Sequence, residues 1–340
     1  MSPIPLVRRP ARQHRRTIAL AACYAMLVSM FGAPAAAQTA NRRTTFIVPA
    51  AAGGSTDVIA RVLAEHMART LGQTVVVENV SGGQATVASA RTAASAPDGA
   101  TVLIAQLPLV SAPFLFTGLR YDTQTAFAPV GLINAGYTVL MARKGLASSP
   151  SEAISRLREN GNGANLGNGG IGSSGHFCEM LLARALGIQP TFVPYRGGAM
   201  AMNDLIGGSL DAICDQSTNA VPQILAGAVQ GVMVAGPARI ATLPDVPTSA
   251  ELGLPEVNLA VWHGMYVARA TPRSIVMQLN ASLGAALADP AVVARFSQLG
   301  TTVFPESQRA PEAHEARFRE EYQRLGRLLS SMGITPQTVE

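Results

Sequence analysis

The sequence predicts an α/β protein built from two lobes with a cleft between them, and three observations support this fold class. Apolar strand-like runs alternate with helical periodicity through the chain, and repeated βαβ units of this kind form parallel sheets with helices on both faces. Two glycine-rich loops, at 49–57 and 167–176, each follow a short apolar run and precede a helical segment. Ligands of such sheets bind beyond the carboxyl ends of the strands, so we expect both loops to line the cleft.

Residues 1–37 have the features of a secretory signal peptide. Five arginines form a basic n-region, the stretch 17–31 is uncharged and apolar, and Ala35-Ala36-Ala37 before Gln38 fits a cleavage site. The apolar stretch is too short to favour a membrane span, and no later segment is long and apolar enough to be one. We therefore expect a soluble, exported protein of 303 residues, a length that suits two lobes better than a single core.

Two features of the leader leave its processing open. Leu20-Ala21-Ala22-Cys23 resembles a lipoprotein cleavage box, but the apolar run continues well past it, which favours an ordinary cysteine inside the apolar segment. Arg15-Arg16 resembles a twin-arginine signal but lacks the usual pattern after it. The route of export, Sec or twin-arginine, therefore stays open.

Without the leader the chain carries no formal net charge. The leader holds five of the 26 Lys and Arg residues and no acidic residue, so 21 basic residues remain against 21 acidic ones. The basic excess of the whole chain is thus no argument for nucleic acid or an acidic membrane as a partner. The remaining cysteines, Cys178 and Cys214, allow either a disulfide or two buried free thiols. We expect no metal site, because the five histidines are scattered without ligand spacing.

The first part of the chain predicts three strands and two helices. Strands are expected at 45–48, 74–77 and 101–104, and helices at 55–71 and 85–96. Apolar residues of the first helix recur on one face, and Gly72 is a typical stop signal. Glu65 and Arg69 are spaced to pair on its solvent side.

The same alternation repeats in the second part of the chain. Strands are expected at 137–142, 165–166, 191–193, 211–214 and 232–234. Helices are expected at 149–159, 174–186 (closed by Gly187) and 199–206, and helices dominate from Arg273 onward. This repetition predicts a second parallel sheet with a glycine-rich loop of its own.

Both loops combine glycines with Ser and Thr residues. Glycine lets the backbone approach a ligand closely, and Ser or Thr side chains cap the helix that follows. The free N–H groups of a helix's first turn carry a partial positive charge that suits an anion. The two loops therefore predict a site for two ends of one acidic small molecule.

At these loops the sequence resembles the periplasmic substrate-binding proteins of tripartite tricarboxylate transporters, the Bug family. The first loop matches the family pattern at Pro49, Ala52, Gly53, Gly54, Ser55, Thr56 and Asp57. The second loop matches it at Gly170, Gly172, Ser173, Ser174 and His176. Further matches cover nearly the whole mature chain, at 75–79, 96–99, 193–197, 204–208, 243–248, 271–272, Asp211 and Asp215.

The resemblance implies a Venus-flytrap fold, type II-like, that closes on a ligand between its lobes. Lobe 1 is then expected at 38–139 plus 263–340, and lobe 2 at 140–262. It also implies a periplasmic, non-enzymatic and monomeric receptor for a small carboxylate, without a cofactor and without nucleic acid as a partner. Its expected partners are one large and one small permease subunit in the membrane. A receptor that feeds a sensor pathway would share this fold and site.

The resemblance also implies which residues bind the ligand, mainly through backbone N–H groups, hydroxyls and ordered waters. The candidates are Ala50, Ala52, Gly53, Gly54, Ser55, Thr56, Asp57, Gly170, Gly172, Ser173, Ser174, His176, Tyr195, Asp215 and Trp262. Asp215 is open to a second interpretation as an acceptor for backbone N–H groups, and Trp262 to one as packing at the crossing between lobes.

Four positions depart from the family pattern. Ala50 and Ala51 replace an aromatic residue and a proline, Val80 replaces an arginine, and His263 replaces an aromatic residue. The two alanines leave room, and we expect no dedicated arginine in the site, with Asp57 and Asp215 adding negative charge. The sequence thus predicts a mono- or dicarboxylate with a bulky, cyclic or aromatic body in preference to citrate or a compact amino acid.

The second loop also allows two other functional interpretations. Gly167, Gly169 and Gly172 match a dinucleotide fingerprint, but the next strand ends in Pro194-Tyr195-Arg196 where an acidic ribose partner is expected. Ser173 or Ser174 with His176 and Asp215 would suggest a hydrolase triad. A helix cap and a packed imidazole explain these residues more simply, and no nucleophile-elbow sequence is present.

Overall fold

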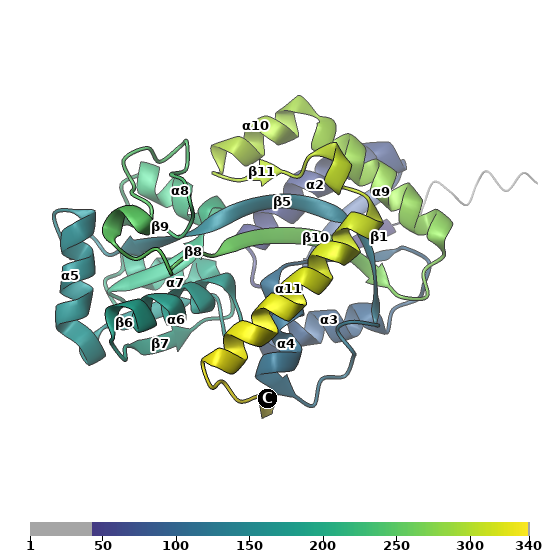
Figure 1. The fold of residues 1–340 in the computed structure, drawn as a ribbon. Helices are drawn as coiled ribbons and strands as arrows, with labels where there is room; N and C mark the ends of the chain where they lie inside the picture. The colour runs from purple at the N-terminus through teal and green to yellow at the C-terminus, as the bar shows by residue number, and fades with distance from the viewer. Residues whose placement is uncertain (1–42, 339–340) are drawn as a thin grey trace, which may run out of the picture. The chain divides into compact units, whose positions relative to one another are not determined.

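A computed structural model of the chain describes residues 43–338, so the leader and its expected cleavage site lie outside the described part. Ten strands of this part form one mixed sheet, whose main path runs β2-β1-β3-β10-β5-β8-β6-β7, with β9 and β11 paired to β5 (Figure 1). A separate two-stranded sheet joins β4 and β12.

The described strands are β1 (Arg43–Val48), β2 (Thr74–Asn79), β3 (Thr101–Ala105), β4 (Phe116–Thr117), β5 (Phe127–Ala142), β6 (Asn165–Asn168), β7 (Thr191–Pro194), β8 (Ala212–Gln216), β9 (Gln230–Val234), β10 (Ala260–Ala268), β11 (Thr302–Val303) and β12 (Gln337–Thr338). The α-helices are α2 (Ser55–Leu71), α3 (Thr86–Ala93), α4 (Leu107–Leu115), α5 (Pro150–Asn160), α6 (Ser174–Leu186), α7 (Gly198–Ile206), α8 (Ser217–Leu225), α9 (Arg273–Ala288), α10 (Pro290–Gln298) and α11 (Pro311–Ser331).

The predicted strand–loop–helix units are confirmed. β1 pairs in parallel with β2 and β3, and β6 pairs in parallel with β7 and β8. Helix α2 ends at Gly72 in a left-handed conformation, and α6 ends at Gly187 in the same way. Arg69 and Glu65 form the expected surface ion pair, at 3.6 Å. Each glycine-rich loop therefore joins a strand to a helix N-terminus.

The two expected parallel regions belong to one mixed sheet, in which two antiparallel strands join them. β5 is 16 residues long and pairs antiparallel with β10 as far as Tyr137. From Thr138 onward it pairs with β8 and β9 instead. The sequence indicated only the second part of β5, and it indicated no strand at β10. This long strand carries the chain from one half of the sheet to the other.

Apolar packing differs between the two halves. One cluster holds β1 and α2 against α9, and a second holds β8 against α7 and α8. Figure 1 shows α11 lying across β5 and β10, and this helix contacts β5 and α4. Within 43–338 no single helix is long and apolar enough to cross a membrane. Helices α9 and α10 reach the length and apolar composition of a membrane span only when taken together, and they are bent by 69° relative to each other.

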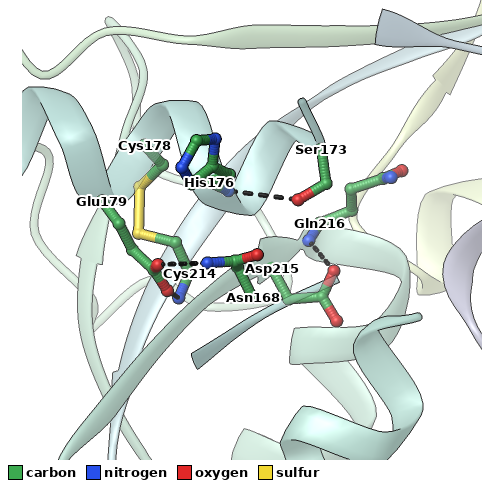
Figure 2. Close-up of a disulfide and its surroundings, with 8 residues drawn as sticks. All are labelled: Asn168, Ser173, His176, Cys178, Glu179, Cys214, Asp215 and Gln216. Atoms are coloured by element: carbon green, nitrogen blue, oxygen red, sulfur yellow. Dashed lines mark hydrogen bonds between the residues drawn. A yellow bond between two sulfur atoms is a disulfide. The ribbon is translucent and has the colours of Figure 1, made fainter. Parts of the chain in front are cut away.

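Cys178 and Cys214 form a disulfide, which decides between the two alternatives left open by the sequence (Figure 2). Cys178 lies in the second turn of α6, and Cys214 lies in β8. Both side chains are buried. The bond therefore ties the helix that follows the second loop to a neighbouring strand.

Candidate functional site

A two-part cleft lies beyond the carboxyl ends of β1 and β6. Its larger part, the outer cavity, has a volume of about 630 Å3, and its smaller part, the inner cavity, about 60 Å3. Five residues line both parts and make them continuous: Pro49, Ala85, Pro108, Gly169 and Ser173. The cleft thus has a narrow inner end and a wide outer compartment.

Several helices begin at the inner cavity, and the N-caps of α3 (Ala85) and α8 (Gln216) line it too. It is lined by residues of the first turns of α2 (Ser55 and Thr56), α4 (Pro108 and Leu109), α6 (Ser174 and Gly175) and α7 (Gly198). The partial positive charges of these N-termini add up in one small volume. The sequence predicted two such termini, and the structure adds those of α3, α4, α7 and α8. The field at the inner end favours an anion.

Several hydrogen-bonding groups at the inner end have no protein partner within residues 43–338. The N–H groups of Ser55, Thr56, Ser174 and Gly175 lie in the first turns of α2 and α6 and donate to no acceptor within this part of the chain. The Ser55 hydroxyl and the amide oxygen of Gln106 are also buried without a partner. Buried polar groups are nearly always hydrogen-bonded, so these groups indicate a place for a polar ligand.

The first loop differs from the expected cap. The N-cap of α2 is Gly54, and no side chain caps this helix, so the expected capping by Ser55 does not occur. Asp57 turns away from the cleft, where its Oδ2 accepts from Gly53 N at 2.9 Å and pairs with Arg61 at 2.9 Å. Burial acts to raise the pKa of Asp57, but the hydrogen bonds from Arg61 and Gly53 outweigh it and lower the pKa. Its charge is therefore compensated outside the site.

The second loop is held by hydrogen bonds of its own. Ser173 caps α6 and accepts from His176 N at 3.1 Å, as the simpler interpretation of these residues predicts (Figure 2). Gly170 N donates to Asn168 Oδ1 at 2.9 Å, and Gly172 N donates to His176 Nδ1 at 3.3 Å. These two N–H groups are thus already used, which leaves those of Ser174 and Gly175 for a ligand.

The buried carboxyl group of Glu179 is hydrogen-bonded to Asn168, at the start of this loop. Glu179 accepts from Asn168 Nδ2 at 2.8 Å and from Cys214 N at 3.3 Å (Figure 2). Burial raises the pKa of Glu179 to about 8. The hydrogen bonds therefore run from Glu179 through Asn168 to the backbone of Gly170.

The structure brings about half of the candidate residues to the cleft. Those that line it are Ala50, Gly54, Ser55, Thr56, Ser173, Ser174, Tyr195 and Asp215. Those that do not line it are Ala52, Gly53, Asp57, Gly170, Gly172, His176 and Trp262. Trp262 is fully buried in β10, where its ring lies edge-on to His314.

Comparison with known proteins identifies the family. Residues 59–334 match the family described as tripartite tricarboxylate transporter family receptor. The chain belongs to this family. Its members are substrate-binding receptors and not enzymes, so the hydrolase alternative has no support.

Solved structures of this family and of its periplasmic relatives share the two-lobe fold. The periplasmic binding protein BugD is 38% identical with a TM-score of 0.83, and the match covers 87% of this chain and 99% of BugD. MatC from Rhodopseudomonas palustris, solved with bound malate, is 37% identical with a TM-score of 0.80, covering 84% and 99%. Rpa4515 from R. palustris, solved with adipate, is 28% identical with a TM-score of 0.82, covering 87% and 99%.

Asp215 of this family receptor lies at the inner cavity and is 8% exposed. Its Oδ1 accepts from Gln216 N at 2.7 Å, and its Oδ2 accepts from Asn219 Nδ2 at 2.5 Å. Burial raises its pKa. The carboxyl group also lies so close to Gly198 that a side-chain carbon there would collide with it. Both interpretations of Asp215 fit this geometry, because it accepts from protein donors and borders the cavity.

Sequence reasoning missed several cleft residues of the receptor. Arg196 lines the outer cavity, so the expectation of a site without an arginine does not hold for this part. Gln84 lines the same cavity, and so do Gln337 and Thr338 of β12. The signal for Arg196 was its place two residues after the end of β7, at the same sheet edge as the second loop. No local pattern indicated Gln84 or the C-terminal strand.

The stability of this receptor is expected to peak near pH 6.5. Burial lowers the pKa of His263 and His314 to about 3 and that of His176 to about 4, each from an ordinary value of 6.5. Below pH 6.5 the unfolded chain takes up protons at these rings that the folded chain does not, so stability falls as the pH falls. Glu179 acts in the opposite direction, because only the folded chain keeps its proton between 4.5 and about 8. Its contribution is lost as the pH rises through that window.

Thermal unfolding between pH 4.5 and 8.5 measures this profile. Glu179→Gln is expected to flatten the decline above pH 6.5, and His314→Phe to reduce the decline below it. A melting temperature that rises steadily from pH 6.5 to 8.5 would contradict the assignment to Glu179.

Proposed function

We propose that the protein is a periplasmic receptor that captures a small carboxylate between its lobes and delivers it to a tripartite tricarboxylate-type transporter. The observation that carries this proposal is the inner cavity, where unpartnered N–H groups of α2 and α6 meet the buried, unpartnered Ser55 hydroxyl. A carboxylate accepts from such donors with both oxygens. The bound malate and adipate of MatC and Rpa4515 support the same class of ligand.

The two parts of the cleft suggest how such a ligand lies. The inner cavity, about 60 Å3, suits one carboxylate, and the outer cavity, about 630 Å3, takes the rest of the molecule. Arg196 lines the outer cavity without an ion-pair partner among the described residues, and it favours a second acidic group. We therefore propose an extended or ring-bearing dicarboxylate as the preferred ligand, ahead of a compact monoacid.

Closure of the lobes is the proposed mechanism. With lobe 1 at 38–139 plus 263–340 and lobe 2 at 140–262, Ala51 and Arg196 lie in different lobes. Ala51 N donates to Arg196 O at 3.1 Å, so the lobes touch directly beside the cleft. A ligand that binds both lobes favours this closed arrangement over an open one, and the difference in affinity shifts the population.

The location and partners of the receptor are part of the proposal. Family members are periplasmic binding proteins, and the basic, apolar leader supports export with cleavage after Ala37. The expected partners are the large and small permease subunits. A receptor that serves a sensor pathway instead would bind the same ligand but would not restore uptake in cells that carry those subunits.

Calorimetry with four acids tests the function. Malate, adipate, phthalate and citrate differ in length, ring content and charge. We expect the protein to bind at least one dicarboxylate and to bind it more tightly than citrate. Native mass spectrometry of protein purified without refolding would identify a retained ligand. Binding of citrate in preference to all three dicarboxylates would contradict the proposed ligand class, and no binding at all would contradict the function.

Ala50→Tyr is expected to weaken binding of phthalate more than binding of malate. Ala50 lines the inner cavity, so an aromatic side chain there takes space next to the ligand body. The bulky ring of phthalate loses more room than the short chain of malate. Paired titrations of the unaltered protein and the variant measure both affinities. An unchanged ranking of the two acids would refute this size argument.

A further inference from the structure

The turn at 82–85 has an unusual backbone. Four consecutive residues have positive φ: Gly82 at 123°, Gly83 at 50°, Gln84 at 52° and Ala85 at 76°. Glycine adopts such values freely, but Gln84 and Ala85 are, within 43–338, the only residues other than glycine that do so. This conformation costs free energy that a glycine at the same place avoids. Strain of this kind often accompanies a functional role.

The strained turn places Gln84 against the opposite wall of the cleft. Gln84 lines the outer cavity together with Tyr195 and Arg196. A side-chain carbon built on Gly170 would lie 2.5 Å from Gln84 Oε1 and 2.9 Å from the Tyr195 carbonyl. The amide of Gln84 therefore reaches the second loop from the other side of the cavity, and only glycine at 170 leaves room for it.

The Gln84 amide has unused hydrogen-bonding capacity. No hydrogen bond joins it to any group within residues 43–338, although the side chain is only partly exposed. The turn itself is closed by other bonds, from Thr86 Oγ1 to Gly83 O at 2.6 Å and from Ala85 N to Gly82 O at 3.2 Å. The turn thus does not need the glutamine side chain.

We propose that Gln84 determines specificity in the outer cavity, where its amide hydrogen-bonds the second acidic group of a dicarboxylate next to Arg196. This inference rests on the proposed function, because it requires the first carboxylate to lie in the inner cavity. The amide N–H donates to a carboxylate oxygen, and the guanidinium supplies the charge. A monoacid of the same length leaves both groups without a partner and gains nothing from Gln84.

Matched pairs of acids test the proposal. The pairs are phthalate with benzoate and adipate with hexanoate, each titrated against the unaltered protein, Gln84→Gly and Gln84→Glu. For the pair whose diacid binds more tightly to the unaltered protein, we expect Gln84→Gly to weaken binding of the diacid about tenfold. The affinity for the matching monoacid is expected to stay unchanged. Gln84→Glu is expected to weaken the diacid further, because it brings a like charge to the second carboxylate.

The melting temperature of the ligand-free variants separates this role from a structural one. Gln84→Gly relieves the left-handed strain, so we expect its melting temperature to equal or exceed that of the unaltered protein. Gln124→Gly, an exposed glutamine that does not line the cleft, serves as the control and is expected to leave all four affinities unchanged.

Three outcomes would overturn the proposal. In the first, Gln84→Gly binds diacid and monoacid as the unaltered protein does. In the second, Gln84→Gly weakens binding of diacid and monoacid equally and melts at a lower temperature than the unaltered protein, which assigns Gln84 a structural role. In the third, the unaltered protein binds none of the four acids, so this inference fails, and the proposed function fails with it if malate and citrate do not bind either.

Discussion

Removal of the disulfide between Cys178 and Cys214 is expected to lower the free energy of unfolding by about 3–4 kcal/mol. The two cysteines are 36 residues apart, and a cross-link over such a loop restricts the unfolded chain strongly. Both side chains are buried, so the double variant Cys178→Ala with Cys214→Ala also loses packing at the joint between α6 and β8. Chemical denaturation of the variant and the unaltered protein measures the difference.

The same change is expected to weaken ligand binding. Gly175, in the first turn of α6, lies so close to the carbonyl of Cys214 that a side-chain carbon there would collide with it. Glu179 adds a hydrogen bond to Cys214 N, so α6 and β8 meet tightly beside the loop that holds Ser174. Without the disulfide, this joint has more freedom and the loop is less well placed.

Reduction provides the control for this prediction. Dithiothreitol is expected to reproduce the loss of stability in the unaltered protein and to have no effect on the double alanine variant. These are the only two cysteines outside the leader, so no other thiol confuses the comparison. Equal unfolding free energies with and without the disulfide would show that the bond adds nothing to stability.

The two ligand loops could be predicted because their signals are local. A short apolar run, glycines, and then Ser or Thr before an amphipathic segment indicate a strand, a turn and a helix within about 15 residues. Helices α2 and α6 were therefore placed almost to the residue. Their neighbours on the sheet follow from the same alternation.

The rest of the fold depends on contacts between distant segments. The first part of β5 and all of β10 were missed because their pairing partners lie more than 100 residues apart in the chain, for example Trp262 with Ala135. The cap of α2 was wrong for a different reason. Gly54 holds the capping position, so Ser55 enters the helix and its hydroxyl is left to the cavity.

For the cleft residues too, local sequence signals could be predicted and contacts between distant segments could not. Arg196 reaches the outer cavity because β7 ends beside β6, and only the assembled sheet brings that end to the cleft. Gln84 gave no sequence signal, since glutamine is not a residue expected at positive φ. The charge of Asp57 was misjudged because Arg61, one turn along α2, neutralises it outside the site.

Ser174→Val is expected to weaken binding of the tightest dicarboxylate by about 1–3 kcal/mol, which is roughly 5- to 150-fold in Kd. Ser174 is 2% exposed and lines the inner cavity, and its hydroxyl has no hydrogen-bond partner within residues 43–338. Valine removes the donor and adds a methyl group beside the cavity, so a ligand oxygen that this hydroxyl meets is left buried and unpaired in a more crowded loop. Calorimetry measures the loss.

Ser151→Val is the matched control for this change. Ser151 also lies in the first turn of a helix, α5, but it is exposed and does not line the cleft, so its replacement is expected to leave Kd unchanged. Circular dichroism should show an intact fold for both variants, because Ser173 and not Ser174 caps α6. If Ser174→Val binds as tightly as Ser151→Val, the N-terminus of α6 shapes the cleft without contacting the ligand through this hydroxyl. Binding at the inner end would then depend on the backbone N–H groups alone, and the positive field of the helix termini would carry the recognition of the carboxylate.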